Sequence, residues 1–255
     1  MSEIRYKQIE EILTDKGHIS VMELQQSFQI SKATAYRYMH FLEKCGRARI
    51  VRGGISQVSH PSFIHYEQPY YEKIGVNTVE KNRIATEACK LIKPGMTIFL
   101  DSSTTVYAMC AKIAHMYDIR VITNDIRIAA SLIDAPGVSI FVSGGNLRKN
   151  YYTLTSHISN CLLSSVTADI GFLSCDAITP EHGCMIVNAD EIPIKKQIID
   201  ISMQRILLCD HTKFNRTAFM SFASIHEFDS IIVGNEISNE LCFQFKKANY
   251  DLTII

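Results

Sequence analysis

The chain has 255 residues, which is enough for more than one small domain. Hydrophobic residues make up 47% and charged residues 20%, close to the average of soluble globular proteins, which excludes a largely disordered chain and a coiled-coil rod. The 26 Lys and Arg balance the 26 Asp and Glu, whereas a dedicated nucleic-acid binder usually has a basic excess. Residues 1–60, however, carry a net charge of +3 and the other 195 residues carry −3, so the balance combines two unlike halves.

The eight cysteines do not form the pattern of a metal site. The closest pair is nine residues apart, and structural zinc sites draw ligands from cysteines separated by only two to four residues. We therefore expect reduced thiols, no metal ion and no cofactor. No apolar stretch approaches the length of about 18 to 20 residues that spans a bilayer, and the N-terminus lacks the apolar region of a signal peptide. These features predict a cytoplasmic protein without a membrane partner.

Three amphipathic helices are expected before residue 45. Apolar residues at helical spacing between residues 2 and 16 predict the first, with Gly17 at its end. Ser20 and Glu23 form a capping box that begins the second, and Ser31 caps the third. On this third helix, one apolar stripe consists of Ala35, Tyr38, Met39 and Leu42. The third helix is thus expected to pack by one face and present the other.

The presented face and the segment after it are basic. Residues 47–58 are typical of two short strands around a Gly-Gly turn, and residues 31–58 carry a local charge of +5. A second helix that follows a short turn, with small, hydroxyl and basic residues in its first turns, is typical of a recognition helix in the major groove. We predict a winged helix-turn-helix that binds duplex DNA; the alternative is a helical protein-interaction module. The candidate DNA-binding residues are Ser31, Lys32, Thr34, Tyr36, Arg37, Arg47, Arg49 and Arg52.

The rest of the chain alternates between short apolar runs and helical patterns. The predicted domains are a winged helix-turn-helix over residues 1–58, an interdomain connection over 59–79 and a mainly parallel α/β domain over 80–255. Helices are expected between most of the strands, for example at 106–116 and 192–203. This pattern is typical of a parallel sheet covered on both faces. The expected strands are residues 97–100, 120–123, 138–142, 169–174, 205–209, 230–233 and 252–255.

Small or hydrogen-bonding residues follow four of these strands. Ligands of open parallel sheets bind outside the carboxyl ends of the strands, and helix N-termini attract anions. Lysines for an anion and carboxylates for hydroxyl groups indicate a phosphorylated polyol or sugar, whereas no glycine-rich nucleotide motif is present. The candidate effector-binding residues are Asp101, Ser102, Ser103, Thr104, Thr105, Asn124, Gly144, Gly145, Glu191, Lys195, Asp210 and Lys213, with Arg148 as a further cation.

Each of these candidates has a simpler structural alternative. Asp101 and the threonines after it could merely cap a helix, and the two glycines could form only a turn. Glu191 and Lys195 could be an exposed i, i+4 ion pair, and Lys213 could be solvated in its loop.

The motifs taken together resemble the DeoR family of bacterial sugar-metabolism repressors over essentially the whole chain. The resemblance implies a sensor domain with the ribose-5-phosphate isomerase-like fold, in which a phosphorylated sugar changes operator affinity. Tyr36 stands where the family usually has an arginine, and Ser103 stands where its Asp-Ser-Gly-Thr-Thr loop has glycine. The residues that carry the resemblance are Ile19–Leu24, Ile30–Thr34, Leu42–Gly46, Arg52–Gly54, Glu80–Ala85, Pro94–Asp101, Thr104–Thr105, Thr123–Asn124, Gly144–Gly145, Glu191 with Lys195, and Asp210–Phe214.

The expected function is therefore a transcriptional repressor of a carbohydrate or nucleoside-sugar operon. Symmetric operators pair two recognition helices, so a homo-oligomer is expected. The rival is a sugar-phosphate isomerase fused to a DNA-binding module. Isomerases of the resembling fold carry an Asp-Gly-Ala-Asp loop after the fourth strand, but residues 174–177 here read Ser-Cys-Asp-Ala. Only one of the two acidic residues is present, so we expect no enzymatic activity.

Overall fold

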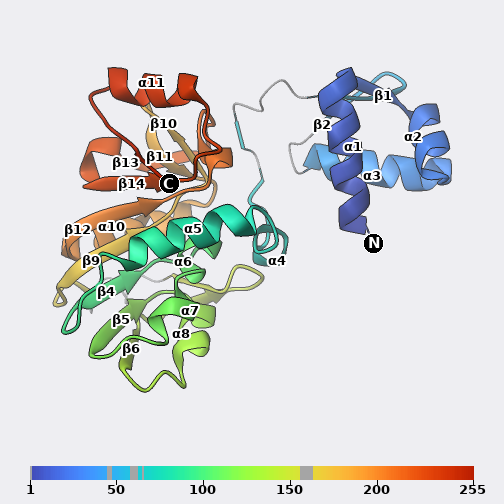
Figure 1. Cartoon of the computed structure of the whole chain (residues 1–255). Helices are drawn as coiled ribbons and strands as arrows, with labels where there is room; N and C mark the ends of the chain where they lie inside the picture. The colour runs from blue at the N-terminus through green and yellow to red at the C-terminus, as the bar shows by residue number, and fades with distance from the viewer. Residues whose placement is uncertain (1, 45–47, 58–62, 65, 156–162) are drawn as a thin grey trace. The chain divides into compact units, whose positions relative to one another are not determined.

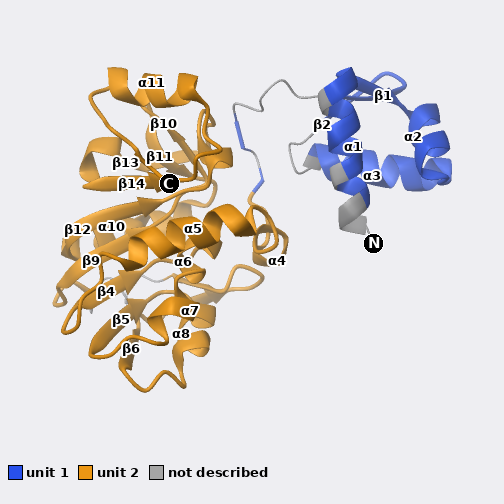
Figure 2. Cartoon of the chain, viewed as in Figure 1, with its two compact units in different colours: residues 1–66 blue, residues 67–255 orange. Residues whose placement is uncertain are grey.

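The computed structural model describes all residues except 1, 45–47, 58–62, 65 and 156–162 (Figure 1). The chain forms two compact units, Met1–Tyr66 and Glu67–Ile255 (Figure 2). Glu67 and the helix α4 (Tyr70–Lys73) lie within the expected interdomain connection but belong to unit 2. None of the helices in the described parts of the chain is long and apolar enough to cross a bilayer.

Unit 1 is a winged helix-turn-helix, as the sequence predicts. The capping box at the start of α2 is present: Ser20 Oγ accepts from the backbone of Glu23, and the Glu23 carboxylate accepts from the backbone of Ser20. The short strand β1 was not expected, and it pairs with the wing to give the antiparallel order β1-β3-β2. The elements of unit 1 are α1 (Ser2–Lys16), β1 (His18–Ser20), α2 (Val21–Phe28), α3 (Lys32–Lys44), β2 (Ala48–Val51) and β3 (Gly54–Gln57).

Glycine is required in the wing for two different reasons. Gly53 has φ +89° and supplies the turn between β2 and β3. Gly54 lies so close to β1 that a Cβ atom would stand 2.2 Å from the carbonyl oxygen of Ile19. The pairing of β1 with the wing therefore depends on a residue without a side chain at position 54.

Unit 2 is built on a seven-stranded sheet in the order β15-β14-β12-β9-β4-β5-β6, and all its pairs are parallel. All seven strands correspond to the apolar runs in the sequence. The chain starts at the centre with β4, moves outward to β6, returns to β9 beside β4 and moves outward in the other direction. The strands are β4 (Thr97–Leu100), β5 (Ile119–Thr123), β6 (Val138–Val142), β9 (Ala168–Leu173), β12 (Ser202–Leu208), β14 (Ser230–Val233) and β15 (Thr253–Ile254).

Helices cover both faces of the sheet, and buried side chains alternate between two cores. On β12, Ile206 and Leu208 belong to one core, and Leu207 to the other. The first core packs under α5 (Thr78–Cys89), α6 (Thr104–Tyr107), α7 (Cys110–Ile113) and α8 (Ile126–Leu132). The second packs under α10 (Ile192–Ile201) and α11 (Asn239–Lys247).

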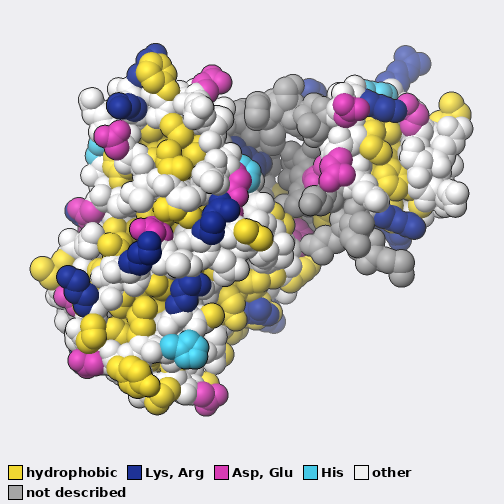
Figure 3. Space-filling view, viewed as in Figure 1, with side chains coloured by type: hydrophobic (Ala, Val, Ile, Leu, Met, Phe, Trp, Pro, Cys, Tyr) yellow, Lys and Arg dark blue, Asp and Glu magenta, His cyan; other side chains and the backbone are white. Residues whose placement is uncertain are grey.

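Two expected helices are shorter than the sequence indicated. The helix expected at 106–116 is divided into α6 and α7, and the helix expected at 192–203 ends at Ile201 because β12 begins at Ser202. Two small antiparallel sheets were not expected. They are formed by β7 (Asn146–Arg148) with β8 (Thr153–Thr155), and by β10 (Ala177–Thr179), β11 (Gly183–Ile186) and β13 (Met220–Ala223). Figure 3 shows that, on the face in view, charged side chains of both signs are interspersed over unit 2.

Candidate functional site

The recognition helix of unit 1 has the two faces that the sequence predicts. Ala35, Tyr38, Met39 and Leu42 are buried. The opposite face is exposed and includes Lys32, Tyr36 and Arg37. The helix begins at Lys32, and Oγ of the preceding Ser31 accepts from the backbone N–H of Thr34 at 3.2 Å.

The wing adds cations to this exposed surface. Arg49 and Arg52 are exposed, and Arg47 lies outside the described residues. The Glu43 carboxylate, on α3, accepts from the backbone N–H of Ile50 at 2.9 Å, which fixes the wing relative to the helix. Helix and wing together present basic and hydroxyl side chains in the arrangement that fits a DNA groove and its phosphates.

Unit 2 has a cavity where the strand order reverses, between β4 and β9. The loops after these two strands leave the sheet in opposite directions. Open parallel sheets bind ligands in the crevice between two such loops. We call the cavity here the switch-point cavity; its volume is about 40 Å³. It is lined by Glu67, Tyr70, Lys73, Ser102, Ser103, Thr104, Thr105, Tyr151, Thr153, Ser174, Cys175, Asp176, Ile186, Glu191, Lys195 and Lys213.

A buried ion pair joins the lining residue Lys195 to Asp101. Lys195 Nζ donates to Asp101 Oδ2 at 2.6 Å and to the carbonyl oxygen of Ser174 at 3.0 Å. The side chains are 3% and 1% exposed. Burial alone would lower the pKa of Lys195, but the charges of Asp101 and Glu191 outweigh burial and raise it. Lys195 is therefore a fixed cation, and its partner is Asp101 rather than Glu191.

The hydroxyl loop after β4 is held by the end of β5. Asn124 Oδ1 accepts from the backbone N–H of Ser102 at 3.0 Å, and the Ser102 hydroxyl lies 2.9 Å from Asp125 Oδ2 and 2.6 Å from Thr153 Oγ1. Asp101 Oδ1 and Asn124 Nδ2 are buried without a hydrogen-bond partner among the described residues. A buried polar atom without a partner is costly, so these two atoms point to a polar ligand beside the loop.

Ser103 fits the loop without strain. Its φ of −164° is extended backbone, and its Oγ accepts from the backbone N–H groups of Thr105 and Val106. Serine in place of the family's glycine therefore caps α6. Because α6 has only four residues, its helix dipole offers little attraction for an anion.

A second set of charges lies at the ends of β9 and β12. Burial opposes the charge of Lys213, but Asp210 and Asp176 outweigh it and raise the pKa of Lys213. Burial likewise opposes ionisation of Asp176, but Lys73, Lys213 and the backbone N–H of Val187 hold the pKa of Asp176 below its usual range. The cavity therefore holds fixed charges of both signs.

Glu191 is the titratable group of the cavity. Burial raises the pKa of Glu191 to about 7, with Glu67 and Asp101 adding to the effect, while Lys195 and Arg148 oppose it. Arg148 donates to the Glu191 carboxylate. The pair is 13% and 11% exposed, so the expected alternative of a solvent-exposed Glu191–Lys195 pair is wrong.

Most of the candidate effector-binding residues meet at this cavity. Asp101 and Asn124 contact lining residues, and Asp210 precedes the short helical turn of Lys213 and caps it. Gly144 and Gly145 are not placed on the cavity; they are exposed, with φ +74° and +116°, and they turn the chain from β6 toward β7. The other seven candidates line it: Ser102, Ser103, Thr104, Thr105, Glu191, Lys195 and Lys213.

Several lining residues were not among the candidate effector-binding residues. Ser174, Cys175 and Asp176 follow β9, so the rule used for the other strand ends could have found them. Glu67, Tyr70 and Lys73 lie before the sheet, and no local signal marks them because only the folded chain brings them to the cavity.

Three residues of types that can bind metal ions lie close together, although their spacing in the sequence did not indicate a cluster. Ligand atoms of Glu80, Asp210 and His211 lie within 4.8 Å of one another. These atoms are already engaged: Glu80 accepts from the backbone N–H of His211 and pairs with its Nδ1, both at 2.7 Å. Asp210 accepts from Asn77 at 3.1 Å. We interpret this group as a hydrogen-bonded network that fixes the loop after β12.

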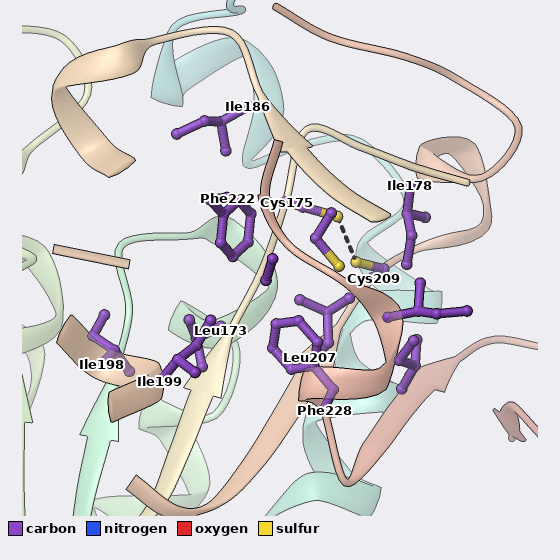
Figure 4. Close-up of a cluster of buried hydrophobic side chains, with 14 of the residues drawn as sticks. Leu173, Cys175, Ile178, Ile186, Ile198, Ile199, Leu207, Cys209, Phe222 and Phe228 are labelled. Atoms are coloured by element: carbon purple, nitrogen blue, oxygen red, sulfur yellow. Dashed lines mark hydrogen bonds between the residues drawn. The ribbon is translucent and has the colours of Figure 1, made fainter. Parts of the chain in front are cut away.

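Two thiols pack beside the cavity. Cys175 and Cys209 have their sulfur atoms 3.3 Å apart within the second core (Figure 4). Burial raises the pKa of both thiols well above the usual value. They are therefore neutral packing groups in this structure.

A winged helix-turn-helix and an α/β unit with a charged cavity define a DNA-binding regulator with a ligand-sensing domain. Comparison with known families agrees: residues 5–60 match the DeoR-like helix-turn-helix domain, and residues 76–235 match the DeoR C terminal sensor domain. The chain belongs to the DeoR family of transcriptional regulators.

Curated relatives align along nearly the whole chain. The transcriptional repressor GlcR of Bacillus subtilis is 31% identical over 99% of this chain and 96% of that protein. A putative aga operon transcriptional repressor of Escherichia coli O157:H7 is 29% identical over 98% of this chain and 93% of that protein. The glycerol-3-phosphate regulon repressor of Escherichia coli K12 is 26% identical over 89% and 88%. Among solved structures, ribose 5-phosphate isomerase A from Methanocaldococcus jannaschii matches 54% of this chain and 55% of that protein, with 16% identity and a TM-score of 0.40.

Proposed function

We propose that this regulator represses a carbohydrate or nucleoside-sugar operon and is controlled by a phosphorylated sugar bound in the switch-point cavity. One observation supports the ligand class most strongly: the cavity combines a buried and a half-buried lysine with hydroxyl groups and carboxylates. Lys195 and Lys213 provide positive charge for a phosphate, while Asp101 has a buried oxygen free to accept from a sugar hydroxyl. The relatives named above include a putative aga operon repressor and a glycerol-3-phosphate regulon repressor.

The ligand class is tested by measuring binding directly. A panel of sugar phosphates with the matching free sugars, titrated calorimetrically into the full chain, should give binding only with a phosphorylated compound. Lys213→Ala should weaken that binding by roughly 10-fold or more, because a hydrogen bond to a charged group is lost. Lys247→Ala is the matched control, since Lys247 lies on α11 and does not line the cavity. Equal binding of phosphorylated and free sugars would contradict the proposal.

For the DNA-binding unit, we propose that α3 reads bases and that the wing contacts phosphates. Arg37→Ala should weaken binding to a duplex selected from a random pool by about 1–3 kcal/mol and relax its sequence preference. Arg49→Ala should weaken binding to all duplexes and reduce the salt slope by about 1. Fluorescence anisotropy at several salt concentrations separates the two effects. An Arg37→Ala protein with unchanged affinity would contradict the helix assignment.

We also propose that residues 1–58 bind DNA without the sensor domain and that the full chain acts as a homo-oligomer in the cytoplasm. A fragment of residues 1–58 should retain weak, salt-sensitive DNA binding. Light scattering of the full chain should give at least a dimer, because a symmetric operator needs two recognition helices. A monomer that binds a palindromic operator with full affinity would contradict the assembly.

The enzymatic alternative is decided by incubation with ribose 5-phosphate and related sugar phosphates. Asp176 is the one carboxylate of the corresponding isomerase loop, and it accepts from the backbone N–H of Val187 while facing Lys73. We propose a sensor without turnover. Isomerised product would refute this part of the proposal.

A further inference from the structure

The first residues of unit 2 pack against the switch-point cavity. We call residues 67–73, from Glu67 through α4, the anchor segment. One side-chain and one backbone hydrogen bond join it to the loop between β7 and β8: Tyr151 Oη donates to the carbonyl oxygen of Glu67 at 3.0 Å, and the N–H of Tyr70 donates to Asn150 O at 3.0 Å. Glu67, Tyr70 and Lys73 all line the cavity. The segment that enters unit 2 from the interdomain connection is therefore part of the cavity wall.

The carboxylate of Glu67 pairs with two cations: Lys73, which lines the cavity, and Arg148, which contacts the lining residues Glu67 and Glu191. Arg148 Nη2 donates to Glu67 Oε2 at 2.7 Å, and Lys73 Nζ lies 3.5 Å from Glu67 Oε1. The Arg148 guanidinium also pairs with Glu191 and lies over the ring of Tyr151 at 4.4 Å. The Glu67 side chain is only 10% exposed. Arg148 is thus shared between two carboxylates that are largely excluded from water.

A carboxylate and a phosphate use the same donors. Both accept paired N–H groups from an arginine and a charge-assisted hydrogen bond from a lysine. With Glu67 in place, its carboxylate already accepts from Arg148 and lies beside Lys73. A phosphate that takes these two donors must therefore displace the Glu67 carboxylate, which is itself an anion at the start of the anchor segment.

We propose that Glu67 is a built-in competitor for the phosphate group of the effector, and that its displacement from Arg148 and Lys73 releases the anchor segment. This inference rests on the proposed function, because it assumes a phosphorylated ligand in the cavity. Glu67 is the first residue of unit 2, and the chain before it leads to the DNA-binding unit. Effector binding then changes how the interdomain connection is anchored. The coupling is reciprocal: if operator DNA favours the anchored state, operator binding weakens effector binding by the same factor by which effector weakens operator binding.

Removal of the competing charge tests the proposal in the full chain. Glu67→Gln keeps the shape of the side chain but not its charge, so inorganic phosphate and the sugar phosphate that binds the wild type should both bind roughly 10-fold more tightly. Glu72→Gln is the matched control: it removes the same charge from the same segment, and Glu72 does not line the cavity. It should leave both affinities within twofold of the wild type. Circular dichroism melting of each variant verifies that it is folded.

Operator affinity is a second readout, which tests whether the anchor segment is released. Without effector, the operator affinity of Glu67→Gln should move toward that of the effector-bound wild type, and the remaining response to effector should shrink. Arg148→Gln should weaken phosphate binding in the wild type and in Glu67→Gln, because the shared donor is lost.

Each outcome decides a different claim. Suppose that the wild type binds a sugar phosphate, but that Glu67→Gln binds this compound and inorganic phosphate no more tightly than the wild type does. Competition by Glu67 is then refuted while the proposed function stands. Tighter binding with unchanged operator affinity refutes the release of the anchor segment. If no sugar phosphate binds the wild type or the variant, the proposed function fails and this inference fails with it.

Discussion

The buried Asp101–Lys195 pair allows a quantitative prediction. In Lys195→Met, the Asp101 carboxylate stays 1% exposed and loses its cation, while Ser174 N at 3.4 Å stays as a weak donor. Removing one partner of a buried pair costs about 3–5 kcal/mol because the other charge is left uncompensated. A unit of this size loses about 2–4 °C per kcal/mol, so its unfolding midpoint should fall by about 6–20 °C.

Calorimetry on the full chain measures this loss in the transition of unit 2. Lys196→Met is the control, since Lys196 is the exposed neighbour on the same helix, and it should change stability by no more than about 0.5 kcal/mol. The double variant Asp101→Asn/Lys195→Met should recover at least half of the loss, because the buried charge is gone. A Lys195→Met protein that loses less than about 1 kcal/mol would refute the interpretation of a desolvated pair.

Three further measurements test other parts of the molecule. The pKa of Glu191 is raised from 4.5 to about 7 in the folded protein, so the contribution of this group to stability is complete below pH 4.5 and is lost as pH rises through 7. Glu191→Gln should flatten this part of the pH–stability profile measured by urea titration. Gly54→Ala should destabilise unit 1 by about 1–3 kcal/mol through the clash with β1, and a normal melting profile of that variant would contradict the close packing of the wing on β1. Native thiol labelling at pH 8, mapped by mass spectrometry, should modify Cys242, which is half-buried, far faster than Cys175 and Cys209, whose pKa values are raised by burial; comparable rates would show that the second core opens.

Much of the fold could be predicted because its signals are local. Each strand of the large sheet is an apolar run, and the recognition helix combines a capping serine with the buried stripe that includes Ala35 and Met39. The strands of the small sheets have only three or four residues with no clear alternation, so the sequence alone does not predict them without their pairing partners. Strand order also depends on long-range pairing. No local feature of the sequence near β4 predicts that it pairs with β9, about 70 residues later.

The candidate site was partly predictable for the same reason. Ser102 and Lys213 follow strands, and a parallel sheet brings such positions to one edge. Gly144 and Gly145 also follow a strand, but β6 is the edge strand and its end is remote from the point where the order reverses. The role proposed for Glu67 depends on a segment that precedes the sheet in the chain and lines the cavity, and neither periodicity nor spacing predicts that position.

The reversal of strand order also divides the chemistry of the cavity between two halves of the sheet. The half that begins with β4 contributes the hydroxyl groups of residues 102–105, and the half that begins with β9 contributes Asp176, Lys195 and Lys213. A ligand that contacts both sets ties together two groups of strands joined at their centre by the three residue pairs of β4 with β9. Bound effector should therefore slow hydrogen exchange at this central seam as well as at the loops it touches, so that one small molecule sets the rigidity of the whole domain.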